Sequence, residues 1–137
     1  MDYLAPALSP EQVNALSALS LAFVGDGVYE LMVRGWLAGQ GSLRSDALHK
    51  LAVGHVSAPA QAGAIRRLLP LLTEEEAAVY RRARNTKVHT AAKNASLADY
   101  HAATGLEALF GWLYLLGRRE RLNVLFTAIV EGDDHAA

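Results

Sequence analysis

The stretch "SLAFVGDGVYE", Ser20–Glu30, decides how this chain folds. Apolar residues recur there at the spacing of a helix, and they continue to about Ala38, which predicts one long core helix. Inside it lie two carboxylates, Asp26 and Glu30. Removing a carboxylate from water is costly unless it is paired, hydrogen-bonded or bound to a metal, so we expect Asp26 to have a partner. That partner can be an arginine, a backbone group or a helix cap, or it can be a divalent cation.

The composition is that of one globular domain. The chain has 137 residues, is 52% hydrophobic, contains no cysteine, and balances 13 Lys and Arg against 14 Asp and Glu. Any nucleic-acid binding must therefore come from a local cluster of charge. The lack of cysteine excludes disulfides and Cys-ligated metal sites and fits a reducing compartment. Because no secretory signal is visible and the longest apolar run is far short of the ~18 residues that span a bilayer, we expect a cytoplasmic protein with no membrane partner.

Helical spacing throughout, with no alternation of strand type, predicts a single all-α domain over residues 1–137, with about six to seven helices. Capping boxes mark two helix starts, Ser9 with Gln12 and Thr73 with Glu76. We expect a frayed tail at residues 132–137. The expected helices run from Ser9 to about Leu19, Ser20 to about Ala38, Ser45 to about Gly54, Ser57 to before Pro70, Thr73 to about Arg84, Ser96 or Asp99 to about Leu116, and Glu120 to Val130.

Small residues accompany the acid in the helix around Asp26. Gly25, Gly27 and Gly35 each weaken a helix interior by ~1 kcal/mol relative to alanine, and close approach of another backbone would explain them. A later stretch, "HAATGLEALFGWLYLLG", places Glu107 among small and aromatic residues in the same manner. Two such helices packed through their small residues would bring both acids to a common ion, for which Mg²⁺ is suited. Two separately satisfied structural acids remain the alternative.

Two motifs carry a resemblance to a known family. "LAFVGDGVYE" is similar to the signature helix of the ribonuclease III catalytic domain, a pattern close to E-F-L-G-D-A-V. "TGLEALFGWLYL" resembles that family's second motif, D-x-x-E-A-L-[IF]-G-x-x-Y-L. The short length, the lack of a downstream double-stranded-RNA-binding domain and the segment "RRARNTK...KNA...YHAATG" narrow the resemblance to the Mini-ribonuclease III subfamily. It covers nearly the whole chain.

The resemblance implies an all-helical endonuclease that works as a homodimer and cuts double-stranded RNA with Mg²⁺, leaving 5′-phosphate and 3′-hydroxyl ends. The implied substrate is precursor 23S ribosomal RNA, with a ribosomal protein as a candidate helper. Carried over by position, Asp26 and Glu107 are the metal-binding and catalytic acids. Phe23 matches the signature aromatic that reaches into a pocket of the partner subunit.

The chain departs from the family pattern at two places. The larger enzymes carry a glutamate where this chain has Ala22 and an aspartate where it has Thr104, so four carboxylates are reduced to two. Such a reduced site would leave the metal more hydrated. Glu30 and Thr104 are candidates for reaching it through a bound water. Glu30 can equally be a surface residue of its helix at the dimer interface.

A positive segment lies between residues 77 and 98, where no acid occurs before Asp99. Duplex RNA is contacted mainly through phosphates and 2′-hydroxyls, which arginine, lysine and asparagine bind without reading base edges. A solvated basic loop balanced by the acidic "TEEE" turn is the alternative. The predicted RNA-binding residues are Arg81, Arg82, Arg84, Asn85, Lys87, Lys93 and Asn94.

Three functions are compatible with these features. The first is a Mg²⁺-dependent endonuclease for duplex RNA. The second is a catalytically weak or silent helical protein that binds double-stranded RNA or the ribosome, which the missing acids at Ala22 and Thr104 make conceivable. The third is a helical interaction module whose acids are structural.

Overall fold

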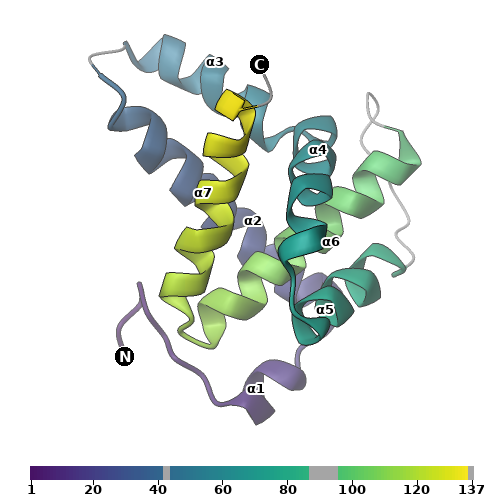
Figure 1. Ribbon diagram of the computed structural model, residues 1–137. Helices are drawn as coiled ribbons and strands as arrows, with labels where there is room; N and C mark the ends of the chain where they lie inside the picture. The colour runs from purple at the N-terminus through teal and green to yellow at the C-terminus, as the bar shows by residue number, and fades with distance from the viewer. Residues whose placement is uncertain (42–43, 87–95, 136–137) are drawn as a thin grey trace.

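The computed structural model describes residues 1–41, 44–86 and 96–135 (Figure 1). These ranges hold seven α-helices, one 3₁₀ turn and no strand, which confirms the all-α fold class. None of these helices combines the length and hydropathy that crossing a bilayer requires. The elements are α1 (Pro10–Asn14), α2 (Ala18–Ala38), α3 (Ser45–Val56), α4 (Ala58–Leu68), η1 (Leu69–Leu71), α5 (Glu74–Arg84), α6 (Leu97–Leu115) and α7 (Arg119–His135).

Helix α6 forms the centre of the fold. Its core residues Leu106, Leu109 and Leu113 are fully buried, and α2, α4, α5 and α7 all pack against it (Figure 1). A helix that is apolar on nearly every side can only be stable when other elements surround it. The most extensive of these contacts is with α2, so the two helices that carry the predicted acids also share the largest helix–helix contact among the described residues.

Glycines allow α2 and α6 to approach each other closely. A Cβ atom on Gly25 would overlap the backbone carbonyl of Glu107, and one on Gly111 would overlap the backbone carbonyl of Leu21. The predicted close approach is therefore confirmed at Gly25. It is wrong for Gly27 and Gly35, where an added Cβ would meet no atom within 4 Å.

The first helix boundary differs from the prediction. Helix α1 ends at Asn14 rather than near Leu19, because Ser17 is extended and its Oγ accepts the backbone N–H of Ser20 at 3.0 Å. Ser17, not Ser20, is thus the cap of α2. The capping boxes at Ser9 and Thr73 are both present as predicted.

The predicted end is right for α6 and wrong for α7. Helix α6 ends at Leu115, close to the predicted end at about Leu116. A left-handed Gly117, whose φ is +76°, follows the cap, and the N–H of Arg118 donates to the carbonyl of Leu113, as in a Schellman cap. Helix α7 continues past the predicted end at Val130 to His135, so residues 132–135, part of the predicted frayed tail, are helical.

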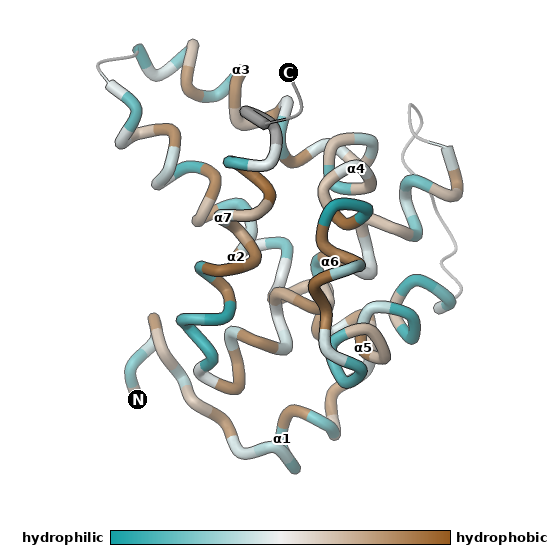
Figure 2. Tube along the Cα trace, viewed as in Figure 1, coloured by the Kyte–Doolittle hydropathy of each residue, from teal (hydrophilic) through white to brown (hydrophobic). Residues whose placement is uncertain are grey.

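Helix α2 is buried on one face only. Leu19, Phe23 and Leu31 are 42%, 82% and 62% exposed, so the predicted core helix belongs to the core of the single chain through one face only. Charged residues are distributed differently, and Figure 2 shows hydrophilic residues gathered on α5 and on the first turn of α7. The molecule therefore presents a hydrophobic face on α2 and a charged face on α5.

Candidate active site and RNA interface

The structure brings Asp26 of α2 and Glu107 of α6 together. Glu107 is half-buried, and its carboxyl group interacts directly with that of Asp26. Burial, followed by the hydrogen bond to Asp26 and the negative charge of Asp26, raises the pKa of Glu107 to about 8. Asp26 itself is exposed, so the burial that we expected at Asp26 falls on Glu107 instead. Two acids held this close retain a proton between them near neutral pH.

A third side chain, Gln61 of α4, faces this pair. It is 2% exposed. Its side chain interacts with the Glu107 carboxyl, and this interaction lowers the pKa of Glu107, although burial and Asp26 raise it by more. Gln61 is not among the site residues predicted from the sequence. A signal was available, because Gln61 shares a helical face with Ile65 and Leu68, both buried, and an amide at such a core position needs an explanation.

The other residues that we considered near the metal have partners of their own. The Thr104 hydroxyl is buried and donates to the backbone carbonyl of Tyr100 at 3.0 Å, within its own helix. Glu30 accepts from Arg34 Nη2 at 2.8 Å in a partly exposed ion pair one turn along α2. That Glu30 and Thr104 contact the metal through a bound water stays a prediction.

The donor set at Asp26 and Glu107 fits a hydrated divalent cation. Across the described residues, no group of three or more His, Cys, Asp or Glu side chains converges on one point, so a cation here would have two protein carboxylates. Mg²⁺ is commonly held by one or two carboxylates, with water and substrate phosphates completing its shell. A cation between the two groups would also relieve the repulsion that raises the pKa of Glu107.

The predicted RNA-binding residues of α5 form a positive surface at the end of that helix. Arg81, Arg82 and Asn85 are exposed. Arg84 is half-buried, with its guanidinium 5.4 Å from the centre of the Tyr80 ring and its Nε donating to Asn85 Oδ1 at 3.2 Å. The remaining predicted residues, Lys87, Lys93 and Asn94, lie outside the described residues.

Tyr80 connects this surface to the pair of acids. Its ring packs on Gly105 of α6, where an added Cβ would come 2.5 Å from Tyr80 Cδ1. Gly105 lies two positions before Glu107 in the same helix. The last turn of α5 is thereby held near the part of α6 that carries the carboxylate.

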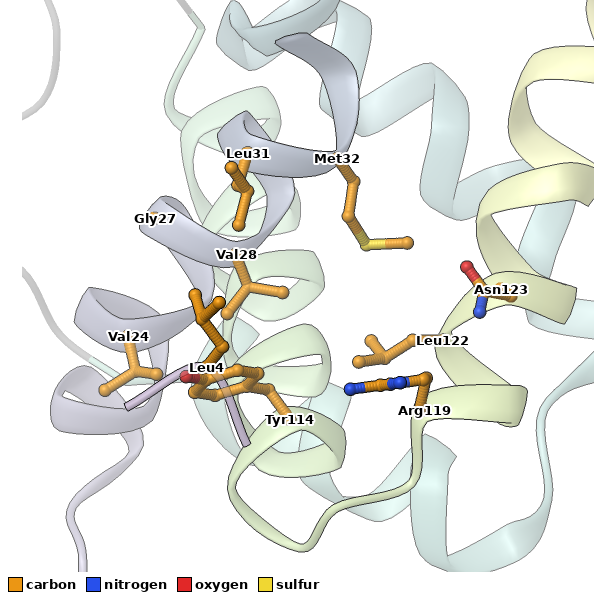
Figure 3. Close-up of a pocket in the computed structure, with 10 residues that line it drawn as sticks. All are labelled: Leu4, Val24, Gly27, Val28, Leu31, Met32, Tyr114, Arg119, Leu122 and Asn123. Atoms are coloured by element: carbon orange, nitrogen blue, oxygen red, sulfur yellow. The ribbon is translucent and has the colours of Figure 1, made fainter. Parts of the chain in front are cut away.

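An apolar groove opens on the other side of α2 (Figure 3). Its volume is ≈ 440 Å³. The Tyr114 hydroxyl donates to the backbone carbonyl of Tyr3 at 2.7 Å, which anchors the N-terminal segment beside the groove. The groove is lined by Leu4, by Val24, Gly27, Val28, Leu31 and Met32 of α2, by Tyr114 of α6, and by Arg119, Leu122 and Asn123 of α7.

Comparison with known proteins defines the class. The family model of the ribonuclease III domain matches residues 19–118, a range that holds both acids and runs from the second residue of α2 to beyond the end of α6. The fold is also similar to the crystal structure of a protein from Fusobacterium nucleatum, with a TM-score of 0.80, 29% identity, and coverage of 89% of this chain and 98% of that one. This is a ribonuclease III domain.

Curated relatives define the branch. The Mini-ribonuclease 3 of Symbiobacterium thermophilum is 47% identical over 116 residues, covering 85% of this chain and 89% of the relative. The Mini-ribonuclease 3 of Clostridium tetani is 36% identical over 145 residues, covering 98% and 96%. The chain belongs to the Mini-ribonuclease III branch of the ribonuclease III family and is an endoribonuclease. Its substrate is RNA, and enzymes of this family generally use a divalent metal.

Proposed function

We propose that the protein is a Mg²⁺-dependent endoribonuclease that cuts double-stranded RNA as a homodimer and matures the ends of precursor 23S ribosomal RNA in the cytoplasm. The observation that carries the proposal is the Glu107 carboxyl, which is half-buried against the carboxyl of Asp26. A protein gains no stability from two adjacent acids, because each raises the cost of ionising the other. Such a pair is useful when a cation binds between them.

Asp26 and Glu107 would hold the cation, and the chain contributes their placement. Bound there, Mg²⁺ would supply an acidified water and offset charge on the attacked phosphate and the leaving oxygen. Gly25 and Gly111 let α2 and α6 approach closely, which sets the distance between the two acids. Glu107 must lose the proton that it shares with Asp26 before it can act as a ligand.

Arg81, Arg82 and Asn85 would bind the RNA backbone. Their side chains are exposed at the end of α5 that Tyr80 ties to α6. One such surface offers few contacts, so two surfaces acting together across a dimer would give useful affinity. Because phosphate contacts release counterions, binding and cleavage should weaken steeply between low and physiological salt. A ribosomal protein that presents the precursor is the helper we expect.

The dimer would form through the hydrophobic face of α2. Phe23 is 82% exposed, and the apolar groove begins with the neighbouring Val24. In a two-fold dimer, the same face of each chain meets its copy, so each Phe23 can enter the groove of the other subunit. We expect Phe23→Asp to run as a monomer in light scattering and Val53→Asp, which changes a 50% exposed residue on α3, to remain dimeric. A monomeric wild type would contradict the dimer.

One experiment tests the proposed activity. Purified protein is incubated with long duplex RNA and with precursor 23S ribosomal RNA, with and without Mg²⁺, and the product ends are mapped. Cutting should require Mg²⁺, leave 5′-phosphates, and disappear in Asp26→Asn and Glu107→Gln while RNA binding survives. Glu75→Gln is the matched control, because Glu75 is an exposed acid on α5 paired with Arg118 at 3.3 Å. Binding without cutting by the wild type would overturn the proposal.

A further inference from the structure

The side-chain amide of Gln61 is buried without a conventional partner. The residue is 2% exposed, and within the part of the chain that the structure describes its Nε2 makes no hydrogen bond of standard length and angle. Leaving a buried amide unpaired costs about 1–3 kcal/mol, so an apolar side chain would be the more stable choice at this position. The glutamine therefore needs a reason other than packing.

The neighbour of this amide is the Glu107 carboxyl. Helix α4 packs on α6, and Gln61 lies on the face of α4 that also carries the fully buried Leu68. Its side chain interacts with the carboxyl group of Glu107, which Asp26 contacts from α2. An amide N–H is a hydrogen-bond donor and a carboxylate oxygen is an acceptor, so the Glu107 carboxylate is a chemically matched partner for this otherwise unpaired amide.

Thr104 gives a useful contrast. It is also buried and polar, it lies on α6, and it stands where the larger enzymes have an acid. Its hydroxyl is satisfied by the backbone carbonyl of Tyr100 at 3.0 Å and needs nothing from the site. Gln61 has no such partner within its own helix: among the described residues its Nε2 makes no hydrogen bond, and its side chain interacts with Glu107 of α6.

We propose that Gln61 is a positioning residue, whose Nε2 donates to the ionised Glu107 carboxylate and holds it turned toward Asp26 for a divalent cation. This inference rests on the proposed metal-dependent function. Partners that orient a metal ligand in this way typically change metal affinity by about 10- to 100-fold when they are removed. Gln61 would therefore act on the metal through Glu107 and not by touching the ion.

The test measures Mn²⁺ binding by calorimetry in the absence of RNA, together with thermal unfolding. Gln61→Met keeps the length of the side chain and removes the donor. We expect Mn²⁺ to bind about 10- to 100-fold more weakly to this variant, while its melting temperature without metal is unchanged or higher. Gln61→Leu also removes the donor but has a different apolar shape, so the same measurement on it provides an independent check. Ile65→Val, one turn along the same helix, should lower the melting temperature and leave Mn²⁺ affinity unchanged.

Wild-type Mn²⁺ affinity in a folded Gln61→Met or Gln61→Leu variant would overturn the inference. The same titration on Asp26→Asn distinguishes this from failure of the proposed function. If Asp26→Asn loses Mn²⁺ binding and the Gln61 variants do not, the metal site stands and the role of Gln61 is wrong. If Asp26→Asn binds Mn²⁺ as the wild type does, the proposed metal site is wrong and the role of Gln61 is overturned with it.

Discussion

Glu76 and Glu107 are two glutamates removed from bulk water in one small domain, and their surroundings are opposite. Glu76, 3% exposed, accepts from Arg121 Nε and Nη2, each at 2.8 Å, and from the backbone N–H of Thr73 at 2.9 Å. Glu107 faces a second acid, Asp26. One carboxylate is surrounded by donors, and the other is held against a like charge.

The difference appears in the pKa values. Burial works to raise the pKa of Glu76, but the hydrogen bonds from Arg121 and Thr73 and the charge of Arg121 outweigh burial, so its pKa is lowered. At Glu107, burial and Asp26 act in the same direction and raise the pKa to about 8. An acid paired with a cation of the chain stabilises the fold. An acid held against another acid is suited to bind a metal cation from solution.

The largest effect should separate catalysis from stability. We expect Asp26→Asn and Glu107→Gln to lower the rate of RNA cleavage by on the order of 10³-fold, because metal-ion chemistry is worth several kcal/mol of barrier. Neither change should lower the melting temperature of the metal-free protein. Glu76→Gln should do the reverse, with a lower melting temperature and near-normal cleavage by the folded fraction. Equal losses of stability in all three variants would contradict the distinction between a stabilising Glu76 and a catalytic pair of Asp26 and Glu107.

The next effect concerns the distance between the acids. Gly25→Ala would place a methyl group against the Glu107 backbone carbonyl, so α2 and α6 must separate. We expect a loss of about 3 kcal/mol or more in the free energy of unfolding, measured by urea denaturation, together with loss of cleavage. Gly35→Ala is the control, because nothing lies within 4 Å of an added Cβ there, and it should stabilise α2 by ~1 kcal/mol. A stable, active Gly25→Ala would show that close helix packing does not set the site.

A smaller loss should follow when the Glu76 pair is broken. Arg121→Met leaves a 3% exposed carboxylate without its cation and removes the donor to the Leu71 carbonyl at 2.7 Å. We expect it to cost about 2–3 kcal/mol in urea denaturation. Glu75→Gln breaks the exposed pair with Arg118, and such pairs contribute about 0–1 kcal/mol. Equal costs for the two variants would mean that burial adds nothing to the Glu76 pair.

The last prediction concerns the pH dependence of stability, to which the two glutamates contribute with opposite signs. The pKa of Glu107 is raised from 4.5 to about 8, so across that range the native state keeps a proton that the unfolded chain has lost, and stability falls as pH rises. Asp26→Asn should flatten this decline. The pKa of Glu76 is lowered from 4.5, so its contribution is present above that value and is lost as pH falls through its native pKa. Glu76→Gln should therefore reduce the sensitivity to acid, as thermal unfolding across pH would show.

Local chemistry explains what could be predicted from the sequence. The capping boxes at Ser9 and Thr73 lie within single helix turns, and they were predicted correctly. The pairing of Asp26 with Glu107 was predictable because each acid sits beside small residues on an apolar helix, a pattern that indicates close packing.

Contacts between distant segments left little local signal. Nothing near Arg121 indicates that it pairs with Glu76, and the contact of Gln61 with Glu107 depends on how α4 lies on α6. The choice of Ser17 over Ser20 as a cap is local but ambiguous in the sequence, since both serines precede apolar residues. The apolar composition of α2 could not distinguish a core face from the exposed face that carries Phe23.

The most direct test of the Asp26 and Glu107 pair is an NMR titration of the Glu107 side-chain carboxyl, with and without Mg²⁺. Without Mg²⁺ we expect its pKa near 8, as the burial and the Asp26 charge require, and we expect saturating Mg²⁺ to move it well below neutral pH. In Asp26→Asn, the metal-free pKa should fall and the response to Mg²⁺ should disappear. An ordinary carboxyl pKa in the wild type that does not respond to Mg²⁺ would contradict the account.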